Sequence, residues 1–169
     1  MITGETVSLR PFERRHLAET RAWANDAELM LLLDRARPVS EVEHEKWFAT
    51  LDEKKSSLYF AIEVNADGQH IGNIWLWDLD WRHRKAELRI VIGNSKQHNR
   101  GAGTEAISLL CYYAFHRLNL HKIYAYVLAV NPRARRSFEK AGFSLEGTLR
   151  EDRWVEESYT DVFLLGKLR

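Results

Sequence analysis

The alternation of apolar and polar side chains between residues 58 and 93 constrains the fold most. Apolar residues occupy every second position of the run LYFAIEV, at Leu58, Phe60, Ile62 and Val64. Period-two alternation is typical of a half-buried β-strand, and Asp67-Gly68 predicts the hairpin turn that follows it. The runs HIGNIWLWDLD (70–80) and KAELRIVIG (85–93) predict two further strands. This region is therefore expected to form a strand meander against which the rest of the chain packs.

Helix and strand patterns alternate along the remaining sequence. Helical spacing of apolar residues occurs over residues 13–26, 40–51, 105–118 and 132–142. Strand patterns occur over residues 6–12, 122–130, 143–150 and 158–168. Ser40 and Glu43 match a capping box, while Pro132 begins the last helix and Gly142 ends it. The order β-α-α-β-β-β-α-β-α-β-β predicts an α/β (α+β) fold with a mixed sheet flanked by helices, in one domain over residues 1–169.

Charge and composition narrow the function. The net charge of +1 gives no overall electrostatic basis for binding nucleic acid or anionic lipid. No apolar stretch approaches the roughly 18 residues of a membrane helix, and the first residues lack a secretory signal pattern. We therefore expect a cytoplasmic protein with no nucleic-acid or membrane partner. His70, His83 and His121 lack the spacing of metal ligands, so no metal site is predicted, and Cys111 is the single cysteine.

Two glycines follow the meander in the run HNRGAGTEA (98–106). A dinucleotide-binding fingerprint would need an acidic residue about 20 positions further on, and residues 119–131 contain none. A Walker A loop would need Gly-Lys-Ser/Thr, which is absent. Glycines that only permit a tight turn remain an alternative. Backbone N–H groups from Asn99 to Thr104 would begin a helix, where they lack intrahelical partners, so with Arg100 they predict an anion site.

The runs ELRIVIG…HNRGAGTEA, NPRARRSFEKAGF and EG…YTDVFLLGKL resemble the GNAT superfamily of N-acetyltransferases over essentially the whole chain. Within it, the chain is most similar to the ribosomal-protein N-terminal and spermidine acetyltransferases. The resemblance implies a mixed central sheet of about seven strands and about four helices, with a splay between two parallel central strands. It also implies acetyl-CoA as the acyl donor, without a metal, and leaves a homo-oligomer open.

The resemblance also implies which residues contact acetyl-CoA. The diphosphate motif corresponds to His98, Asn99, Arg100, Gly101, Ala102, Gly103 and Thr104, and His98 replaces the usual Gln or Arg of the family. Ile90, Val91 and Ile92 would lie at the splay, where main-chain groups pair with pantetheine. Asn131 and Phe138 would border the same arm, and Arg136 would contact the 3′-phosphate. Asn131 can also be read as a helix N-cap before Pro132.

Acetyl transfer to an amine requires an uncharged nitrogen and a proton for the leaving thiolate. Deprotonating an alkyl amine of pKa about 10.4 at pH 7 costs about 4.6 kcal/mol, whereas a peptide α-amino group costs about 1 kcal/mol. Glu87 is the candidate base, because strand alternation puts it on the same face as Val91, near the splay. The alternative is a strand carboxylate paired with Arg89.

The usual general acid of the family is missing from this sequence. The family pattern Asn-x-x-Ala-x-x-x-Tyr-x-Lys-x-Gly-Phe matches Asn131, Ala134, Lys140, Gly142 and Phe143, but Phe138 takes the place of the tyrosine. Phenylalanine cannot donate a proton. Ser137, Tyr124 or Tyr126 would have to substitute, or the thiolate would be protonated by water.

Aromatic and acidic residues predict the acceptor cleft. Trp75, Trp77 and Asp78 lie on one strand, Trp23 on the first helix and Tyr159 on the last strand. Such a cleft suits a cationic amine. We expect an acetyl-CoA-dependent N-acetyltransferase that acts on a small-molecule primary amine, such as a polyamine or an amino sugar. A protein N-terminus is the alternative acceptor, and a non-catalytic acyl-CoA-binding sensor is the alternative class.

Overall fold

The computed structural model describes residues 1–93 and 101–169. Within these residues the strands are β1 (Ile2–Thr3), β2 (Val7–Pro11), β3 (Leu58–Val64), β4 (His70–Asp80), β5 (Lys85–Ile92), β6 (Lys122–Leu128), β7 (Ser144–Val155) and β8 (Ser158–Leu168). The α-helices are α1 (Leu17–Ala24), α2 (Ala27–Leu32), α3 (Glu41–Ala49), α4 (Ala102–His116) and α5 (Pro132–Lys140), and a 3-10 turn, Arg14–His16, precedes α1. The described strands form one sheet of order β1-β2-β3-β4-β5-β6-β8-β7.

The sheet opens in its centre, between β5 and β6. These two strands are parallel and pair only from Lys85 opposite Lys122 to Glu87 opposite Tyr124. Beyond that point β5 continues to Ile92 and β6 to Leu128 without pairing to each other. The other strand pairs of the sheet are antiparallel. The predicted splay between two parallel central strands is therefore confirmed.

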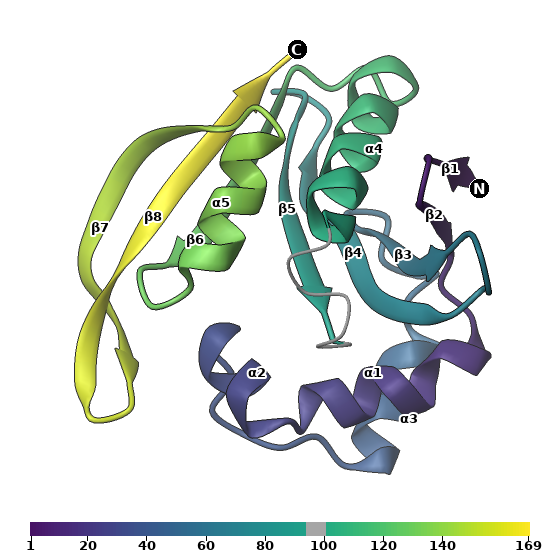
Figure 1. The fold of residues 1–169 in the computed structure, drawn as a ribbon, viewed down its shortest axis with the longest axis horizontal. Coiled ribbons are helices and arrows are strands. Elements are labelled where there is room, and N and C mark those ends of the chain that lie inside the picture. Colours follow the sequence, from purple (N-terminus) through teal and green to yellow (C-terminus); the bar gives the residue numbers. More distant parts are fainter. Residues whose placement is uncertain (94–100) are drawn as a thin grey trace.

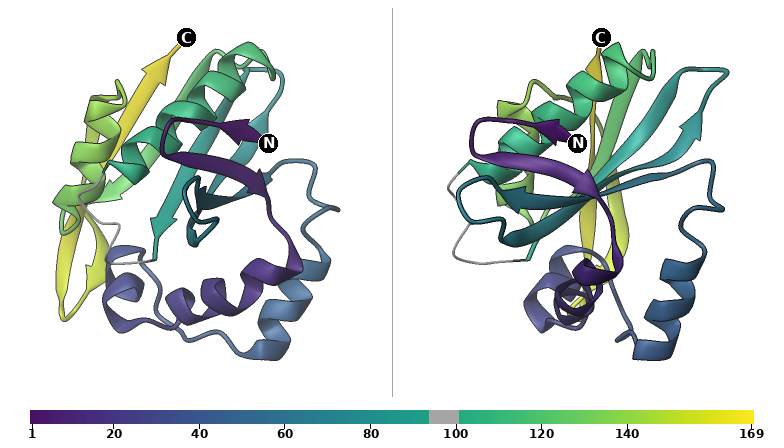
Figure 2. Two further views of the ribbon diagram at one scale, coloured as in Figure 1. Left: turned by 45° about the vertical axis from the view of Figure 1, so that its right-hand side comes forward. Right: turned by 90° about the vertical axis from the view of Figure 1, so that its right-hand side faces the viewer.

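The two faces of the meander have different roles. Ile74, Leu76 and Leu88 face the main core with at most 1% of their surface exposed, together with Ile107 and Leu110 of α4. Burying each such side chain contributes roughly 1.5–3 kcal/mol. Because side chains alternate along a strand, the same pattern places Trp75 and Trp77 of β4 on the opposite face. In Figure 1, α4 and α5 lie against the sheet, while α1, α2 and α3 are grouped near the end of β5. Figure 2 shows the same separation from two further directions.

Local sequence signals explain several helix ends. Ser40 Oγ accepts from the Glu43 amide at 3.2 Å, and Glu43 Oε2 accepts from the Ser40 amide at 2.9 Å, which confirms the predicted capping box before α3. The helix expected over residues 13–26 was too long. It starts with the 3-10 turn and stops at Asn25, because Asp26 caps a new helix by accepting from the Leu29 amide at 2.9 Å.

The sequence therefore missed α2, and it also missed the two-residue strand β1. The described residues contain eight strands and five α-helices, against the expected seven and four. Cys111 lies on the buried face of α4, and burial raises the pKa of its thiol to about 12, so it behaves as a small core residue. No helix among the described residues has the length and apolarity to span a membrane.

Candidate active site

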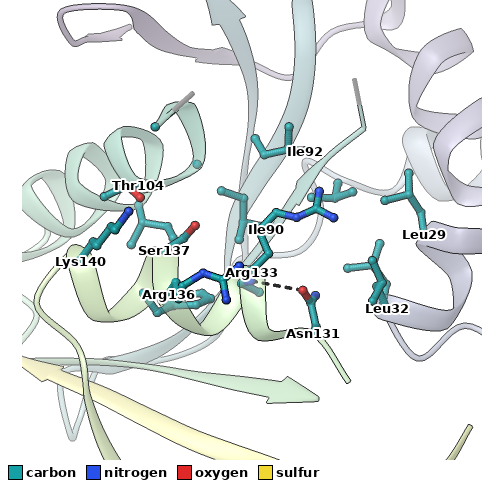
Figure 3. A pocket seen from close by; sticks show the side chains of 17 residues that line it. Leu29, Leu32, Ile90, Ile92, Thr104, Asn131, Arg133, Arg136, Ser137 and Lys140 are labelled. Atoms are coloured by element: carbon teal, nitrogen blue, oxygen red, sulfur yellow. Dashed lines mark hydrogen bonds between the residues drawn. The ribbon is translucent and has the colours of Figure 1, made fainter. Parts of the chain in front are cut away.

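A first pocket of about 200 Å³ lies at the open end of the splay. Its apolar walls come from Ile90 and Ile92 on β5 and from Leu29 and Leu32 on α2. Its polar side consists of groups on α4 and α5, shown in Figure 3: Thr104, Asn131, Arg133, Arg136, Ser137 and Lys140. One end of the pocket can thus bind an anion, while the rest is shaped for an apolar chain.

The start of α4 supplies the anion-binding end. Gly101 occupies the N-cap position with a φ of 82°, in the left-handed region that favours glycine. A Cβ on Gly101 would meet nothing within 4 Å, and one on Gly103 would be 3.7 Å from Ile92 Cγ1. The first backbone N–H groups of a helix lack intrahelical partners and carry partial positive charge. His98, Asn99 and Arg100, which belong to the same predicted motif, lie outside the described residues.

Asn131 caps α5 and also lies at the wall of the first pocket. Its Oδ1 accepts from the Ala134 amide at 3.2 Å, so it caps α5, and the residue also lines the first pocket. Figure 3 shows this hydrogen bond at the pocket wall. Arg136 and Lys140 lie on the following turns of α5 and add positive charge to the same side. These groups and the apolar walls fit the phosphates and the pantetheine arm of coenzyme A.

A second pocket of about 390 Å³ adjoins the first. Val91 and Leu33 line both pockets, so the two cavities meet at the end of β5. Trp23, Trp75 and Trp77, three of the predicted acceptor-binding residues, line this second pocket together. A Cβ on Gly93 would lie 2.0 Å from Trp23 Cδ2, which means that the indole ring packs directly against the backbone of residue 93.

Aromatic rings that the sequence analysis did not identify complete the wall of the second pocket. Tyr59 stacks on Trp75 with centroids 5.4 Å apart, and Trp47 meets Tyr59 edge-on at 5.6 Å. His44 stacks on Trp47 at 5.0 Å. Period two could have found Tyr59, because it stands opposite Trp75 in the register of β3 and β4. Trp47 and His44 come from α3, and their approach to the sheet depends on tertiary packing.

Burial sets the protonation of the groups in the second pocket. It lowers the pKa of His44 from its ordinary value of 6.5, with a further contribution from Arg21 and Arg35, so the imidazole is neutral at pH 7. Burial raises the pKa of Tyr59, which keeps its hydroxyl protonated. It also lowers the pKa of Arg35, whose guanidinium nevertheless stays charged at neutral pH.

A comparison with known protein families identifies the fold. The family profile described as acetyltransferase (GNAT) domain matches residues 6–144. The chain belongs to the GNAT acetyltransferase family. A spermidine N(1)-acetyltransferase of Escherichia coli (strain K12) is 31% identical over 162 residues, covering 96% of this chain and 86% of that relative.

Solved structures of this GNAT family resemble the chain closely. A crystal structure of spermidine N-acetyltransferase from Vibrio cholerae in complex with CoA and spermine has a TM-score of 0.91 at 28% identity, covering 98% of this chain and 96% of that one. A dodecameric structure of the Vibrio cholerae enzyme has a TM-score of 0.82 at 28% identity and covers 98% and 95% of the two chains. The expected GNAT N-acetyltransferase fold is thus confirmed.

The candidate base of this GNAT acetyltransferase, Glu87, is held by an ion pair. Its side chain accepts from Arg89 twice, at 2.7 Å from Nε and 3.1 Å from Nη2, and only 7% of Glu87 is exposed. Arg89 also lies over the ring of Trp77, 5.0 Å from its centroid. Glu87 lines neither pocket, so a proton would reach it from the acceptor through water.

The candidate acids are placed differently. Ser137 lines the first pocket, and Phe138, in the position of the family tyrosine, is buried against Phe143 at 5.0 Å. Tyr124 stands opposite Glu87 in the register of β5 and β6, and burial, followed by Asp78 and Glu87, raises the pKa of its hydroxyl. It remains protonated at neutral pH and lies at the narrow end of the splay.

Two predicted acceptor-binding residues lie outside both pockets. Asp78 is exposed at an irregular point of β4, where the register with β5 shifts and its φ is 52°. Its carboxylate lines neither pocket and acts instead on the hydroxyl of Tyr124, whose pKa it helps to raise. Tyr159 is 62% exposed and contacts Trp154 on the β7–β8 hairpin, away from the two pockets. The described residues contain no group of three side chains that could hold a metal.

Proposed function

We propose that this protein transfers an acetyl group from acetyl-CoA directly to the primary amine of a small molecule. The observation that carries the proposal is the meeting of two pockets at Val91 and Leu33, at the open end of the splay. One pocket has the charge and shape for an acyl donor, and the other has aromatic walls for an acceptor. Two substrates bound in them would meet at the end of β5.

The first pocket would hold acetyl-CoA, which supplies an activated thioester. The first turn of α4, from Gly101 to Thr104, would bind the diphosphate through its backbone N–H groups. Arg136 would pair with the 3′-phosphate. The apolar side chains of β5 and α2 would exclude water from the pantetheine arm, with Asn131 at its border.

The edge of β5 beyond Glu87 has no strand partner on β6. Its backbone groups near Val91 would steady the negative charge that develops on the carbonyl oxygen. Glu87, through water, would take the proton of the acceptor amine. His44 is neutral at pH 7 and lines the second pocket, so it is a second group able to accept that proton. Ser137 is the candidate that lies nearest the donor pocket for protonating the thiolate.

The names of the relatives support a polyamine as the first acceptor to assay. The relatives described above act on spermidine by name, and one was crystallised with spermine. A polyamine was also an acceptor class expected from the sequence, alongside an amino sugar. We do not propose a protein N-terminus, because those relatives give it no support. We further propose a homo-oligomer, since a structure of the Vibrio cholerae enzyme is dodecameric.

The test is a thiol-release assay with acetyl-CoA and a panel of amines that includes spermidine, an amino sugar and a peptide with a free N-terminus. We expect thiol release that depends on a small primary amine, with the acetylated amine identified by mass spectrometry. Binding of acetyl-CoA without turnover of any amine would contradict the proposal and favour a non-catalytic sensor. Turnover of the peptide alone would contradict the proposed acceptor class.

A further inference from the structure

The second pocket carries an unbalanced charge. Arg35, Lys54 and Arg89 line it, and no Asp or Glu is among the described residues that form its wall. Arg89 is neutralised, because both oxygens of Glu87 accept from its guanidinium. Arg35 and Lys54 have no ion pair within the parts of the chain that the structure describes. Two positive charges in the acceptor pocket therefore lack a counter-charge from the described residues.

Further hydrogen-bond donors lie along this wall. Trp75 lines the pocket, and its indole N–H is buried without a hydrogen-bond partner among the described residues. The hydroxyl of Tyr59 is protonated. Arg35 is exposed as a whole, but nearby protein atoms crowd its guanidinium enough to lower its pKa. Polar groups and charges that lose water without gaining a partner are costly, so such a wall favours a ligand that brings negative charge.

A polyamine with several positive charges is expected to bind this wall weakly. Aromatic rings attract a cation, and the stacked Tyr59 and Trp75 could bind an apolar or a cationic group. A second ammonium group near Arg35 or Lys54 would, however, meet like charge. No carboxylate from the described lining residues is available to offset that repulsion. The acidic side of the cleft expected from the sequence is thus absent from this pocket, because Asp78 does not line it.

We propose that the preferred acceptor joins its primary amine to an anionic group, such as a carboxylate, that binds Arg35 and Lys54. Its amine end would lie toward Val91, where the two pockets meet, and its apolar part would lie against the aromatic wall. This inference rests on the proposed N-acetyltransferase function and narrows its acceptor class. It makes Arg35 and Lys54 specificity-determining residues that touch the substrate and take no part in proton transfer.

The experiment compares amines of equal length that differ only at the far end. Initial rates of thiol release are measured for 5-aminopentanoate, pentylamine and cadaverine, and for the aromatic pair 4-(2-aminoethyl)benzoate and phenethylamine, with spermidine as reference. We expect carboxylate-bearing amines to have kcat/KM values at least about tenfold above their matched uncharged partners, since a hydrogen-bonded ion pair is worth that much. Cadaverine and spermidine should be the poorest acceptors.

Variants connect this preference to the pocket. Arg35→Gln and Lys54→Gln should each reduce the carboxylate preference about tenfold through KM, with the CoA dissociation constant unchanged. Arg37→Gln and Lys55→Gln remove the neighbouring charges outside the pocket and should keep the preference. If spermidine or cadaverine matches or exceeds the carboxylate-bearing amines, or if Arg35→Gln leaves the ranking intact, this inference is wrong and the proposed function stands. Absence of thiol release with every amine would instead contradict the proposed function.

Discussion

Replacing Gly103 by Ala distinguishes a role of this glycine in stability from a role in binding CoA. Gly103 is the second residue of α4, and a Cβ there would make only ordinary contacts, 3.7 Å from Ile92 Cγ1 and 3.8 Å from Ser137 Oγ. Its φ is not in the left-handed region. Alanine should therefore fit the free protein and reduce the conformational entropy of the unfolded chain, raising the free energy of unfolding by about 0.5–1 kcal/mol.

That gain corresponds to a rise in Tm of about 1–4 °C for a chain of this size. The same methyl group would occupy the space through which a diphosphate approaches the first turn of α4. We expect the affinity for CoA to fall at least about tenfold, or about 1.4 kcal/mol. Thermal unfolding of the free protein and calorimetric titration with CoA measure the two effects, which should have opposite signs.

Gly101→Ala is the matched control. Gly101 has a φ of 82°, so alanine there should lower the free energy of unfolding by about 1 kcal/mol, although nothing lies within 4 Å of its Cβ. A Gly103→Ala variant that is more stable and binds CoA as tightly as the wild type would refute the reasoning about the diphosphate. A variant that is less stable would show that Gly103 serves the fold.

Gly93→Ala should displace Trp23, because the new Cβ would lie 2.0 Å from its ring. The KM for the acceptor should rise about tenfold, and the free energy of unfolding should fall by about 1–3 kcal/mol. Gly147→Ala, with open space around the Cβ, is the control, and equal KM values would contradict the role of Trp23. Glu87→Gln should lower kcat about tenfold at pH 7, and the kcat of the variant should approach the wild-type value as the pH nears the pKa of the amine. A pH–rate profile parallel to that of the wild type would argue against Glu87 as the base. Burial lowers the pKa of His16 below 6.5, so the unfolded chain binds more protons than the folded chain. The free energy of unfolding should therefore fall as the pH drops below about 6.5, by at most about 1.4 kcal/mol per pH unit. Urea denaturation of His16→Gln at several pH values should show a free energy of unfolding that depends less steeply on pH than in the wild type. An unchanged pH dependence would rule out His16 as the cause.

The sequence predicted the parts of the fold that follow from local pattern. Period two located the meander, and capping chemistry located the start of α3 at Ser40 and of α5 at Asn131. The missed helix α2 depends on the cap at Asp26, which occurs within an apparently continuous helical pattern. A two-residue strand such as β1 is too short to leave a period. The single domain over residues 1–169 stays a prediction.

The site was predictable only where it depends on alternation or on a helix end. Trp75 and Trp77 share a face of β4, and they line the second pocket together with Trp23. Alternation separates Asp78, the next residue, from the face of Trp77, and Asp78 lines neither pocket. Arg35 lies in the segment between α2 and α3, and no periodicity indicates where such a segment packs. The roles of the predicted site residues stay predictions until variants are tested.

Direct transfer between the two pockets is the central claim, and initial-rate kinetics with both substrates varied test it most directly. A ternary complex at the junction of the pockets predicts double-reciprocal lines that intersect when acetyl-CoA and the amine are varied together. Parallel lines would indicate an acetylated enzyme intermediate and would contradict transfer across Val91 from one bound substrate to the other.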